Sequence, residues 1–551
     1  MADPITSTFP YAVASFEPTT TGILLWTHLG GGRTEARWAI ARDPAMADVV
    51  ERGHATTSVD HGHAITVPVE GLEPSTTYWY RFEAGADRSP VGRTRTLPGD
   101  GATTFRVATV CCARYSVAPL GVYRAVADRE VDLVLHLGDY IYEDDGSSGG
   151  RDHDPPRTAT TLDDYRRRIA QIRSDPDAQA LHLRHPVVTI WDDHDLADNA
   201  WRDGAKAHDP DEHGPWSDRV AAAARARQEW LPGRLRDPDD VLTTWRSLEV
   251  GDLAEVLLLD TRLQGRDRQA GDDESPDLDD PDRSLLGDRQ RTWLAERLAD
   301  TSRRWAVLAS GVVVNELELS WPRPLRWINA LLPNGYAVLD GRVLHDDQWD
   351  GYPAERARLV GWLRARGEAG GRTLLLSGDV HSSWAFDGPA DEDGVVAVEA
   401  TTPAVSSAAM GRAHLPGMWR LLDRAANDLA HVRWADVTER GYAVTDIDRD
   451  GVTCTWWFVH PYDEDPANRA LPAASFRSER AQWPPRWTAV QPVTADPVRV
   501  GLPEAAPDRP DDLRHLRTRR RVRLAVEPST AIATTVASVA AVVWRRRARQ
   551  R

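Results

Sequence analysis

Four stretches of the sequence contain residue types that can bind metals, and each stretch directly follows an apolar run. The thiols, carboxylates, imidazoles and phenol in question belong to Cys111, Cys112, Asp139, Tyr142, Asp193, His194, Asp379 and His381. Two cations held a few ångström apart by a bridging carboxylate can polarise a phosphoryl group and generate hydroxide near neutral pH. The pattern therefore indicates metal-dependent chemistry on phosphate.

The first stretch ends in two adjacent cysteines, Cys111 and Cys112. A thiolate at this position would be a strong ligand for iron or zinc. Buried cysteine is also common as a small hydrophobic residue, so simple packing is the alternative interpretation. Because the two cysteines stand side by side, the sequence leaves open which of them would bind.

The second stretch joins an aspartate to a tyrosine. Gly138 lets the chain turn after residues 131–137, so that Asp139 lies at the strand tip. Tyr142, three residues later, can return to the same centre as a phenolate. A strand that ends in Gly-Asp is common in α/β proteins, and the tyrosine at this spacing makes the signal more specific.

The third stretch, residues 192–199, combines aspartates such as Asp193 with His194 and Asn199. Buried carboxylates repel one another and lose ionisation unless they are solvated or bind a metal. An acidic loop that caps a helix is the alternative. The position directly after an apolar run favours a metal site.

The fourth stretch places Asp379 and His381 after residues 373–376. A spacing of two puts both side chains on the same side of an extended segment. Rigid neighbouring strands can bring side chains from distant parts of a sequence together at their ends. We therefore expect the four stretches to meet at one edge of a sheet.

The elements that must position these side chains are buried strands and amphipathic helices. Continuous apolar runs without polar alternation are typical of strands covered on both faces. They are residues 105–110, 131–137, 187–191, 254–259, 305–309 and 373–376. Residues 285–298 and 354–364 have apolar residues at three- and four-residue spacing, which predicts helices, and residues 442–459 predict a hairpin. The sequence predicts a layered α/β domain over residues 99–460.

Residues 1–98 predict a small β-sandwich. Short runs rich in β-forming residues alternate with turn residues such as those at 30–32. Residues 71–81 resemble the segment of fibronectin-type sandwiches in which a tyrosine hydroxyl ties a corner back to the backbone. The turn-rich residues 97–101 would close this domain.

Residues 461–551 form a Pro- and Arg-rich extension with weak periodicity. Its apolar segment 530–544 is shorter than the about 20 residues that a membrane span needs. A solvated basic tail is the favoured interpretation. The alternative is weak contact with a membrane surface through a helix that favours anionic lipid.

The composition narrows the function classes. A formal net charge of −17 argues against a general nucleic-acid surface, whereas excess carboxylate suits either solubility or a cation-binding enzyme. Three cysteines exclude a disulfide framework as the main source of stability for a chain of 551 residues. Residues 1–10 show no charged and apolar pattern of a signal peptide, so a cytoplasmic location is the default expectation.

The four stretches in this order resemble the calcineurin-like metallophosphoesterases, and specifically the PhoD-like alkaline phosphatase family, up to about residue 460. Further matching segments are residues 9–15, 24–27, 259–262, 347–352 and 401–407. The resemblance implies an α/β fold, a layered metallophosphoesterase sandwich preceded by a small N-terminal β-sandwich. It also implies hydrolysis of phosphate monoesters or diesters.

The resemblance further implies iron(III) paired with one or more calcium ions, or with another divalent cation at the second site. The implied iron ligands are Cys112, Asp139, Tyr142 and His381. The second metal would share Asp139 and add Asp193 and Asp379, with Asn199 nearby. His194 stands where this superfamily places a histidine that orients phosphate or protonates the leaving alcohol.

Several positions differ from the family pattern. Ser15-Phe16-Glu17-Pro18 stands where Gly-Asp-Pro is usual, and His28 stands where arginine is usual. Cys111 and Ala113, on either side of Cys112, stand where the family has a small polar and a polar residue. None of these differences removes an implied ligand. The family's usual twin-arginine leader is not seen, so the sequence does not support the expectation of an exported location.

Two other functions are weighed against hydrolysis. A binding or scaffolding protein could keep the fold without turnover. Such a protein is expected to lack at least one metal-binding residue, whereas this sequence has a metal-binding residue at every implied ligand position. A single-iron oxygenase would leave Cys112 and Tyr142 unexplained.

Residues 144–154 and the tryptophans Trp321, Trp327 and Trp349 are candidate pocket walls, with ordinary packing as the alternative for each tryptophan.

Overall fold

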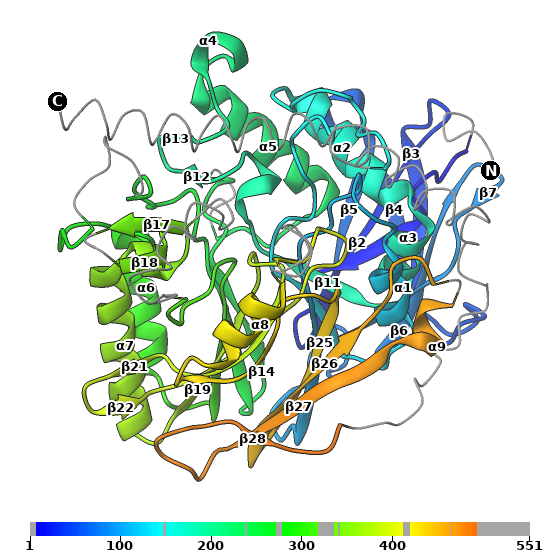
Figure 1. The fold of residues 1–551 in the computed structure, drawn as a ribbon. Coiled ribbons are helices and arrows are strands. Elements are labelled where there is room, and N and C mark those ends of the chain that lie inside the picture. Colours follow the sequence, from blue (N-terminus) through cyan, green and yellow to red (C-terminus); the bar gives the residue numbers. More distant parts are fainter. Residues whose placement is uncertain are drawn as a thin grey trace.

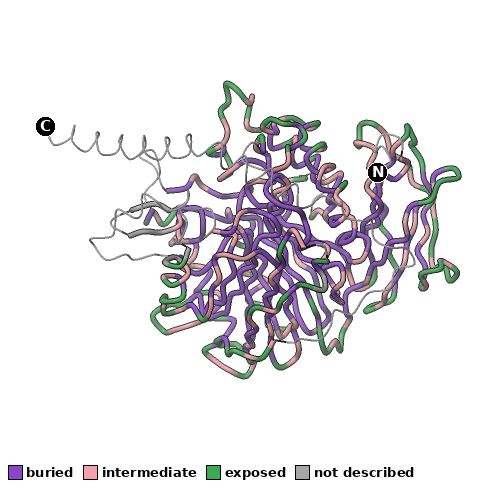
Figure 2. Tube along the Cα trace, turned by 45° about the vertical axis from the view of Figure 1, so that its right-hand side comes forward, coloured by how far each residue is buried: buried purple, intermediate pink, exposed green. Residues whose placement is uncertain are grey.

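Two large β-sheets packed face to face form the centre of the molecule, with helices on both outer faces (Figure 1). The structure is a computed structural model that describes residues 7–492 except 147–149, 237–239, 271–277, 318–335, 340–341, 411–418 and 464. Buried residues follow the strands through the interior, and exposed residues lie on the outer loops (Figure 2). The layered α/β architecture and the preceding β-rich domain confirm the predicted fold class.

The first sheet has ten strands, and its central strands β9, β10, β11 and β1 run parallel. In sheet order these strands are β28 (Thr488–Ala489), β27 (Leu471–Glu479), β26 (Gly451–Phe458), β25 (Gly441–Asp448), β9 (Thr104–Val110), β10 (Leu133–His136), β11 (Pro186–Thr189), β1 (Val13–Phe16), β2 (Gly22–His28) and β5 (Ala64–Glu70). The predicted hairpin is β25 and β26, which pair antiparallel. Since parallel strands end at the same edge, the residues after β9, β10 and β11 are brought together.

The second sheet has seven strands, of which β15, β16, β19 and β23 run parallel. In sheet order its strands are β14 (Arg246–Val250), β15 (Ala254–Leu258), β16 (Trp305–Ala309), β19 (Arg372–Ser377), β23 (Val398–Thr401), β20 (Ser383–Asp387) and β24 (Val432–Asp436). One apolar cluster joins residues of β9 and β10 to residues of β15, β16 and β19, so the two sheets share a core.

Helices cover the outer face of each sheet. A second apolar cluster packs helices against the ten-stranded sheet; they are α1 (Gly121–Ala127), α2 (Leu162–Ser174), α3 (Pro176–Arg184) and α5 (Trp216–Trp230). The seven-stranded sheet is covered by α6 (Gly287–Ala299) and α7 (Pro353–Glu368), which correspond to the two helices expected at 285–298 and 354–364. The central strands β10, β11, β15, β16 and β19 are therefore buried at every position, as their continuous apolar runs predict.

The N-terminal β-structure packs as a sandwich, and one of its two sheets continues into the rest of the molecule. A five-stranded sheet lies over β1, β2 and β5; it comprises β4 (Val49–Thr56), β3 (Glu35–Ala41), β6 (Thr77–Ala84), β7 (Asp87–Arg88) and β8 (Gly92–Arg95). The tyrosine corner is present, because the Glu73 backbone N–H donates to the Tyr78 hydroxyl over 2.9 Å. Strand β1 pairs with β2 on one side and parallel with β11 on the other.

The segment after residue 460 contributes two strands that its weak periodicity does not predict. Strand β27 pairs with β26 along its length and places Phe476 in the core between the sheets. The domain boundaries at 98 and 460 stay predictions. The basic tail and its apolar segment 530–544 lie outside the described residues. Within the described part of the chain, no helix is both long and apolar enough to cross a membrane.

Short elements complete the chain. Among the described residues they are α4 (Pro210–His213), α8 (Trp419–Asn427), α9 (Pro466–Arg469), the hairpin strands β12 (Ala200–Trp201), β13 (Gly204–Ala205), β17 (Tyr336–Leu339), β18 (Arg342–His345), β21 (Ala390–Asp391) and β22 (Gly394–Val395), and single 3₁₀ turns at Val59–His61, Asp193–Asp195 and Trp349–Gly351.

Candidate metal centre

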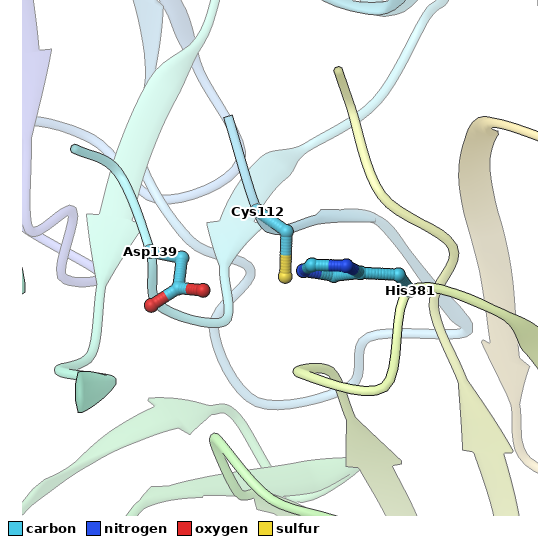
Figure 3. A group of neighbouring side chains, drawn as sticks. All are labelled: Cys112, Asp139 and His381. Atoms are coloured by element: carbon cyan, nitrogen blue, oxygen red, sulfur yellow. The ribbon is translucent and has the colours of Figure 1, made fainter. Parts of the chain in front are cut away.

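The four metal-binding stretches meet where strands of both sheets end. Cys112 follows β9, Asp139 follows β10, and His381 follows β19 of the other sheet. Figure 3 shows their thiol, carboxylate and imidazole pointing toward one another. One ligand atom from each of the three lies within 4.8 Å of the others. Residues more than a hundred positions apart are thus gathered in one buried place.

Tyr142 completes this first group. Its hydroxyl donates to Asp139 Oδ2 over 2.9 Å and lies 3.1 Å from His381 Nε2. Burial raises the pKa of the Tyr142 phenol well above its usual value, and the nearby Asp139 carboxylate adds to this effect. The phenol is therefore neutral without a cation, and a bound metal would be needed to ionise it.

The geometry separates the two adjacent cysteines. The Cys111 thiol lies 3.5 Å from the carbonyl oxygen of Thr402 and 3.7 Å from that of Pro403. Only Cys112 belongs to a cluster of possible metal ligands among the described residues. The geometry therefore favours Cys112 over Cys111 as the candidate ligand.

The backbone at the centre is held in unusual conformations. Five of the residues predicted for the site have positive φ angles: Cys112 (60°), Asp139 (55°), Asn199 (52°), Asp379 (65°) and His381 (51°). Non-glycine residues adopt this region at a cost, and such residues gather at functional sites. Gly138 precedes one of them with φ of 100°, and a Cβ there would lie 2.3 Å from the Asp192 Cβ. Only glycine fits this close approach.

A second group shares Asp139 with the first. Carboxylate oxygens of Asp139, Asp192, Asp193 and Asp379 all lie within 4.8 Å of one another. Burial, with repulsion from neighbouring carboxylates, raises the pKa of Asp139 and of Asp379 well above the usual value. Asp192 Oδ2 is buried without a hydrogen-bond partner, and Asp193 Oδ1 has an ion pair with Arg262 but no hydrogen bond. Oxygens left in this state fit a cation that would bind among them.

A buried arginine lies against this carboxylate group. Arg262 donates from Nε to Asp192 Oδ1, and its Nη2 lies 3.3 Å from Asp193 Oδ1. Its Nη1 lies 2.8 Å from both carboxylate oxygens of Asp347. Burial alone would raise the pKa of Asp193, but Arg262 outweighs it and lowers that pKa to about 2. Asp193 is therefore ionised at neutral pH, which is the form in which a carboxyl group binds a metal.

His194 lies beside both groups. Its backbone N–H donates to Asp139 Oδ1 over 3.2 Å, and its Nδ1 lies 2.7 Å from Glu143 Oε2. Its ring centroid is 4.2 Å from that of Tyr142. Burial alone would lower the pKa of His194, but the Glu143 and Asp193 carboxylates outweigh it and raise that pKa well above 6.5. The imidazole can thus hold a proton at the edge of the centre.

His381 has the opposite character. Burial and the positive charge of His194 lower the pKa of His381 to about 3, so its imidazole is neutral. Its Nδ1 lies 3.1 Å from the Ala408 carbonyl oxygen, which can only accept. Nδ1 therefore carries the hydrogen, and Nε2 presents its lone pair to the group, as a metal-binding imidazole does.

The remaining aspartates and Asn199 have other partners. Asp195 accepts from the backbone N–H groups of Asp139 and Tyr140, at 3.0 and 2.8 Å, and so holds the turn after β10. The Asn199 backbone N–H donates to Asp193 Oδ2 over 2.7 Å, which places Asn199 beside the second group. The sequence pattern by itself indicates no role for Glu143, Arg262 or Gln348. The side-chain amide of Gln348 donates a hydrogen bond to Asp379 Oδ2.

Two of the matching segments hold these missed residues. Arg262 ends the segment 259–262 after β15, and Gln348 lies in the segment 347–352. Their place in segments that match the family pattern is the signal for these two residues, since neither residue type by itself indicates a metal centre. Trp349 is fully buried in the core under α7, as the packing alternative expects, whereas Trp321 and Trp327 lie outside the described residues.

Comparison with known proteins agrees with this geometry. The family model described as PhoD-like phosphatase matches residues 107–456, and the model of the N-terminal domain of the same family matches residues 2–98. The chain belongs to the PhoD-like phosphatase family. Alkaline phosphatase D of Bacillus subtilis (strain 168) is 34% identical over 418 residues, which are 70% of this chain and 66% of that protein.

A solved structure titled "Structure of PhoD" superposes with a TM-score of 0.75 at 26% identity, covering 94% of this chain and 98% of that one. The PhoD-like resemblance is thereby confirmed, and the prediction of a phosphoester hydrolase is confirmed at the level of the family. The PhoD-like phosphatases are metal-dependent, and the clusters described above can bind metal.

Proposed function

We propose that this chain hydrolyses phosphate esters at a centre of two or more metals, iron(III) with calcium or another divalent cation. The observation that carries the proposal is the position of Asp139, which is shared by a group containing a thiol and an imidazole and by a group of carboxylates. Thiolate, phenolate and imidazole suit iron, whereas carboxylate and amide oxygens suit calcium.

The proposed ligands follow from the two groups. Iron would be held by Cys112, Asp139, Tyr142 and His381. The divalent cation would be held by Asp139, Asp193 and Asp379, with Asn199 beside it. The metals would supply Lewis acidity toward the phosphoryl group and a hydroxide nucleophile at neutral pH.

The chain's own residues would position the ester and move a proton. His194 holds a proton next to both groups, so we assign it the proton that the leaving alcohol takes up. Glu143 fixes the ring through Nδ1 and leaves Nε2 as the donor to the ester oxygen. Arg262 offsets the charge of Asp192, so that fewer carboxylates compete for the cations.

The test is elemental analysis and a visible spectrum of protein purified without added metal, followed by monoester and diester assays. We expect about one iron per chain, a phenolate-to-iron absorption band, a divalent cation and hydrolysis of at least one ester class. Failure to hold a transition metal even after reconstitution, with no hydrolysis, would contradict the proposal and favour a scaffolding role.

A further inference from the structure

The loop after β23 contacts the residues of the proposed iron site from outside. We call residues 402–408 the serine loop. Its Ala404 pairs with Cys111 in a parallel bridge, and the Val405 N–H donates to the Cys111 carbonyl over 2.8 Å. The backbone N–H groups of Ser406 and Ser407 both donate to the Cys112 carbonyl, at 3.3 and 3.2 Å. The loop is thus hydrogen-bonded to the segment that carries the thiol.

The same loop contacts two further side chains of the group. The Ser407 hydroxyl donates to the Tyr142 hydroxyl oxygen over 2.7 Å. The Ala408 carbonyl lies 3.1 Å from His381 Nδ1. The serine loop therefore hydrogen-bonds to three of the four proposed iron ligands, through the backbone of Cys112 and through the side chains of Tyr142 and His381.

The loop is itself held in place from behind. Arg440 is buried, and its Nε donates to the carbonyl oxygens of Ser406 and Ser407, at 3.0 and 2.6 Å. Both serines are fully buried. A hydroxyl fixed in this way loses little further freedom when it donates a hydrogen bond.

Among the described residues, three groups lie within hydrogen-bond distance of the Tyr142 oxygen, and one of them can donate to a phenolate. Asp139 brings a carboxylate, and His381 Nε2 brings a lone pair because Nδ1 carries the hydrogen. Ser407 alone brings an O–H. The Cys112 carbonyl, 3.0 Å from the Ser407 hydroxyl, already accepts two backbone N–H groups. The hydroxyl is therefore available to the phenolate, where a charge-assisted hydrogen bond is stronger.

We propose that Ser407 is a positioning residue of the iron site. It donates a hydrogen bond to the Tyr142 phenolate and so sets how much electron density that ligand gives to iron. This inference rests on the proposed function. Stabilising the negative charge on the phenolate oxygen lowers the energy of its filled orbital. The charge-transfer absorption from phenolate to iron therefore lies at shorter wavelength than it would without the serine.

The experiment compares visible spectra of iron-loaded Ser407→Ala and Ser406→Ala with that of the unchanged protein. Ser406 is the matched control, because it is equally buried but its hydroxyl donates to the Arg114 carbonyl over 3.0 Å. We expect the band of Ser407→Ala to move to longer wavelength and that of Ser406→Ala to stay in place. Ser407→Thr, which restores a hydroxyl, should return the band toward its original wavelength.

Two results would overturn the inference: a Ser407→Ala band at the original wavelength with full iron content, or an equal shift in Ser406→Ala. If Ser407→Ala does not fold, Ser407→Cys is used, because a thiol is a weaker hydrogen-bond donor of similar size. The band of this variant should also move to longer wavelength, and a band that does not move contradicts the proposal. Failure of the unchanged protein to hold iron would instead contradict the proposed centre.

Discussion

The buried Glu143 and the partly buried His194 form a pair in which Oε2 and Nδ1 lie 2.7 Å apart. The other carboxylate oxygen of Glu143 accepts the Asp198 backbone N–H over 2.8 Å, so the glutamate cannot turn away. The pair fixes both the orientation of the imidazole and its charge. Its consequences for catalysis can be measured directly.

The first prediction concerns pH dependence. A histidine that gives up a proton to the leaving group must be protonated, so activity falls as pH rises through its pKa. Glu143→Gln removes a carboxylate that raises the pKa of His194. We expect the alkaline limb of the kcat/KM profile to move to lower pH in this variant. A limb that stays in place would contradict the pairing as the source of the raised pKa.

The second prediction concerns His194 itself. His194→Asn removes the proton donor, and we expect kcat for an alkyl phosphate ester to fall by about 10²- to 10⁴-fold. An ester with a good leaving group such as p-nitrophenolate should lose much less, because that leaving group needs no proton. The two substrates serve as controls for each other, and equal losses for both would rule out the assigned role.

The third prediction distinguishes the two cysteines by metal content. Cys112→Ser replaces the thiol that faces Asp139 and His381, and it should lose iron. Cys111→Ser replaces a thiol that faces the Thr402 and Pro403 carbonyls, and it should retain iron. Elemental analysis of both variants checks the assignment, which the reverse result would move by one residue.

The fourth prediction concerns the shared carboxylate. Asp139 belongs to both groups, so Asp139→Asn should lower the occupancy of both metals. Asp379→Asn, which changes only the second group, should lower the divalent cation and leave most of the iron. Loss of a single metal from Asp139→Asn would show that this residue does not bridge.

The fifth prediction concerns acid stability away from the centre. Burial, together with the charge of Arg93, lowers the pKa of His185 to about 3, while an unfolded histidine titrates near 6.5. Below pH 6.5 the unfolded chain binds the proton and the folded one does not, so stability falls as pH falls toward 3. Between pH 7 and 5 we expect His185→Gln to lose about 2 kcal/mol less unfolding free energy than the unchanged protein. Denaturant titrations at the two pH values measure this, and equal losses would exclude His185 as a cause.

The sequence predicts those structural features that depend on neighbouring residues. Uninterrupted apolar runs predict strands buried on both faces, and β9, β15, β16 and β19 lie where these runs indicate. The turn chemistry of Gly138 and the metal-binding side chains after each run point to the edge where they are found. Such features depend on a few neighbouring residues and can be read without the fold.

Other parts depend on partners that are distant in the chain. Arg262 contacts Asp192 and Asp347, which are 70 and 85 residues away, so its burial has no local signature. Strand β27 contains a proline and has no regular apolar pattern, and its pairing with β26 decides its structure. The choice between Cys111 and Cys112 likewise needs the path of the chain after β9, which the sequence pattern does not specify.

The pairing of β1 with β11 has a consequence for any attempt to shorten this protein. Because β1, β2 and β5 extend the same sheet that carries Asp139 and Cys112, a chain starting at residue 99 would leave β11 with an open hydrogen-bonding edge. Such edges recruit strands from other molecules. The chain that starts at residue 99 should therefore aggregate through this edge, so removing the N-terminal strands would not give a smaller stable enzyme.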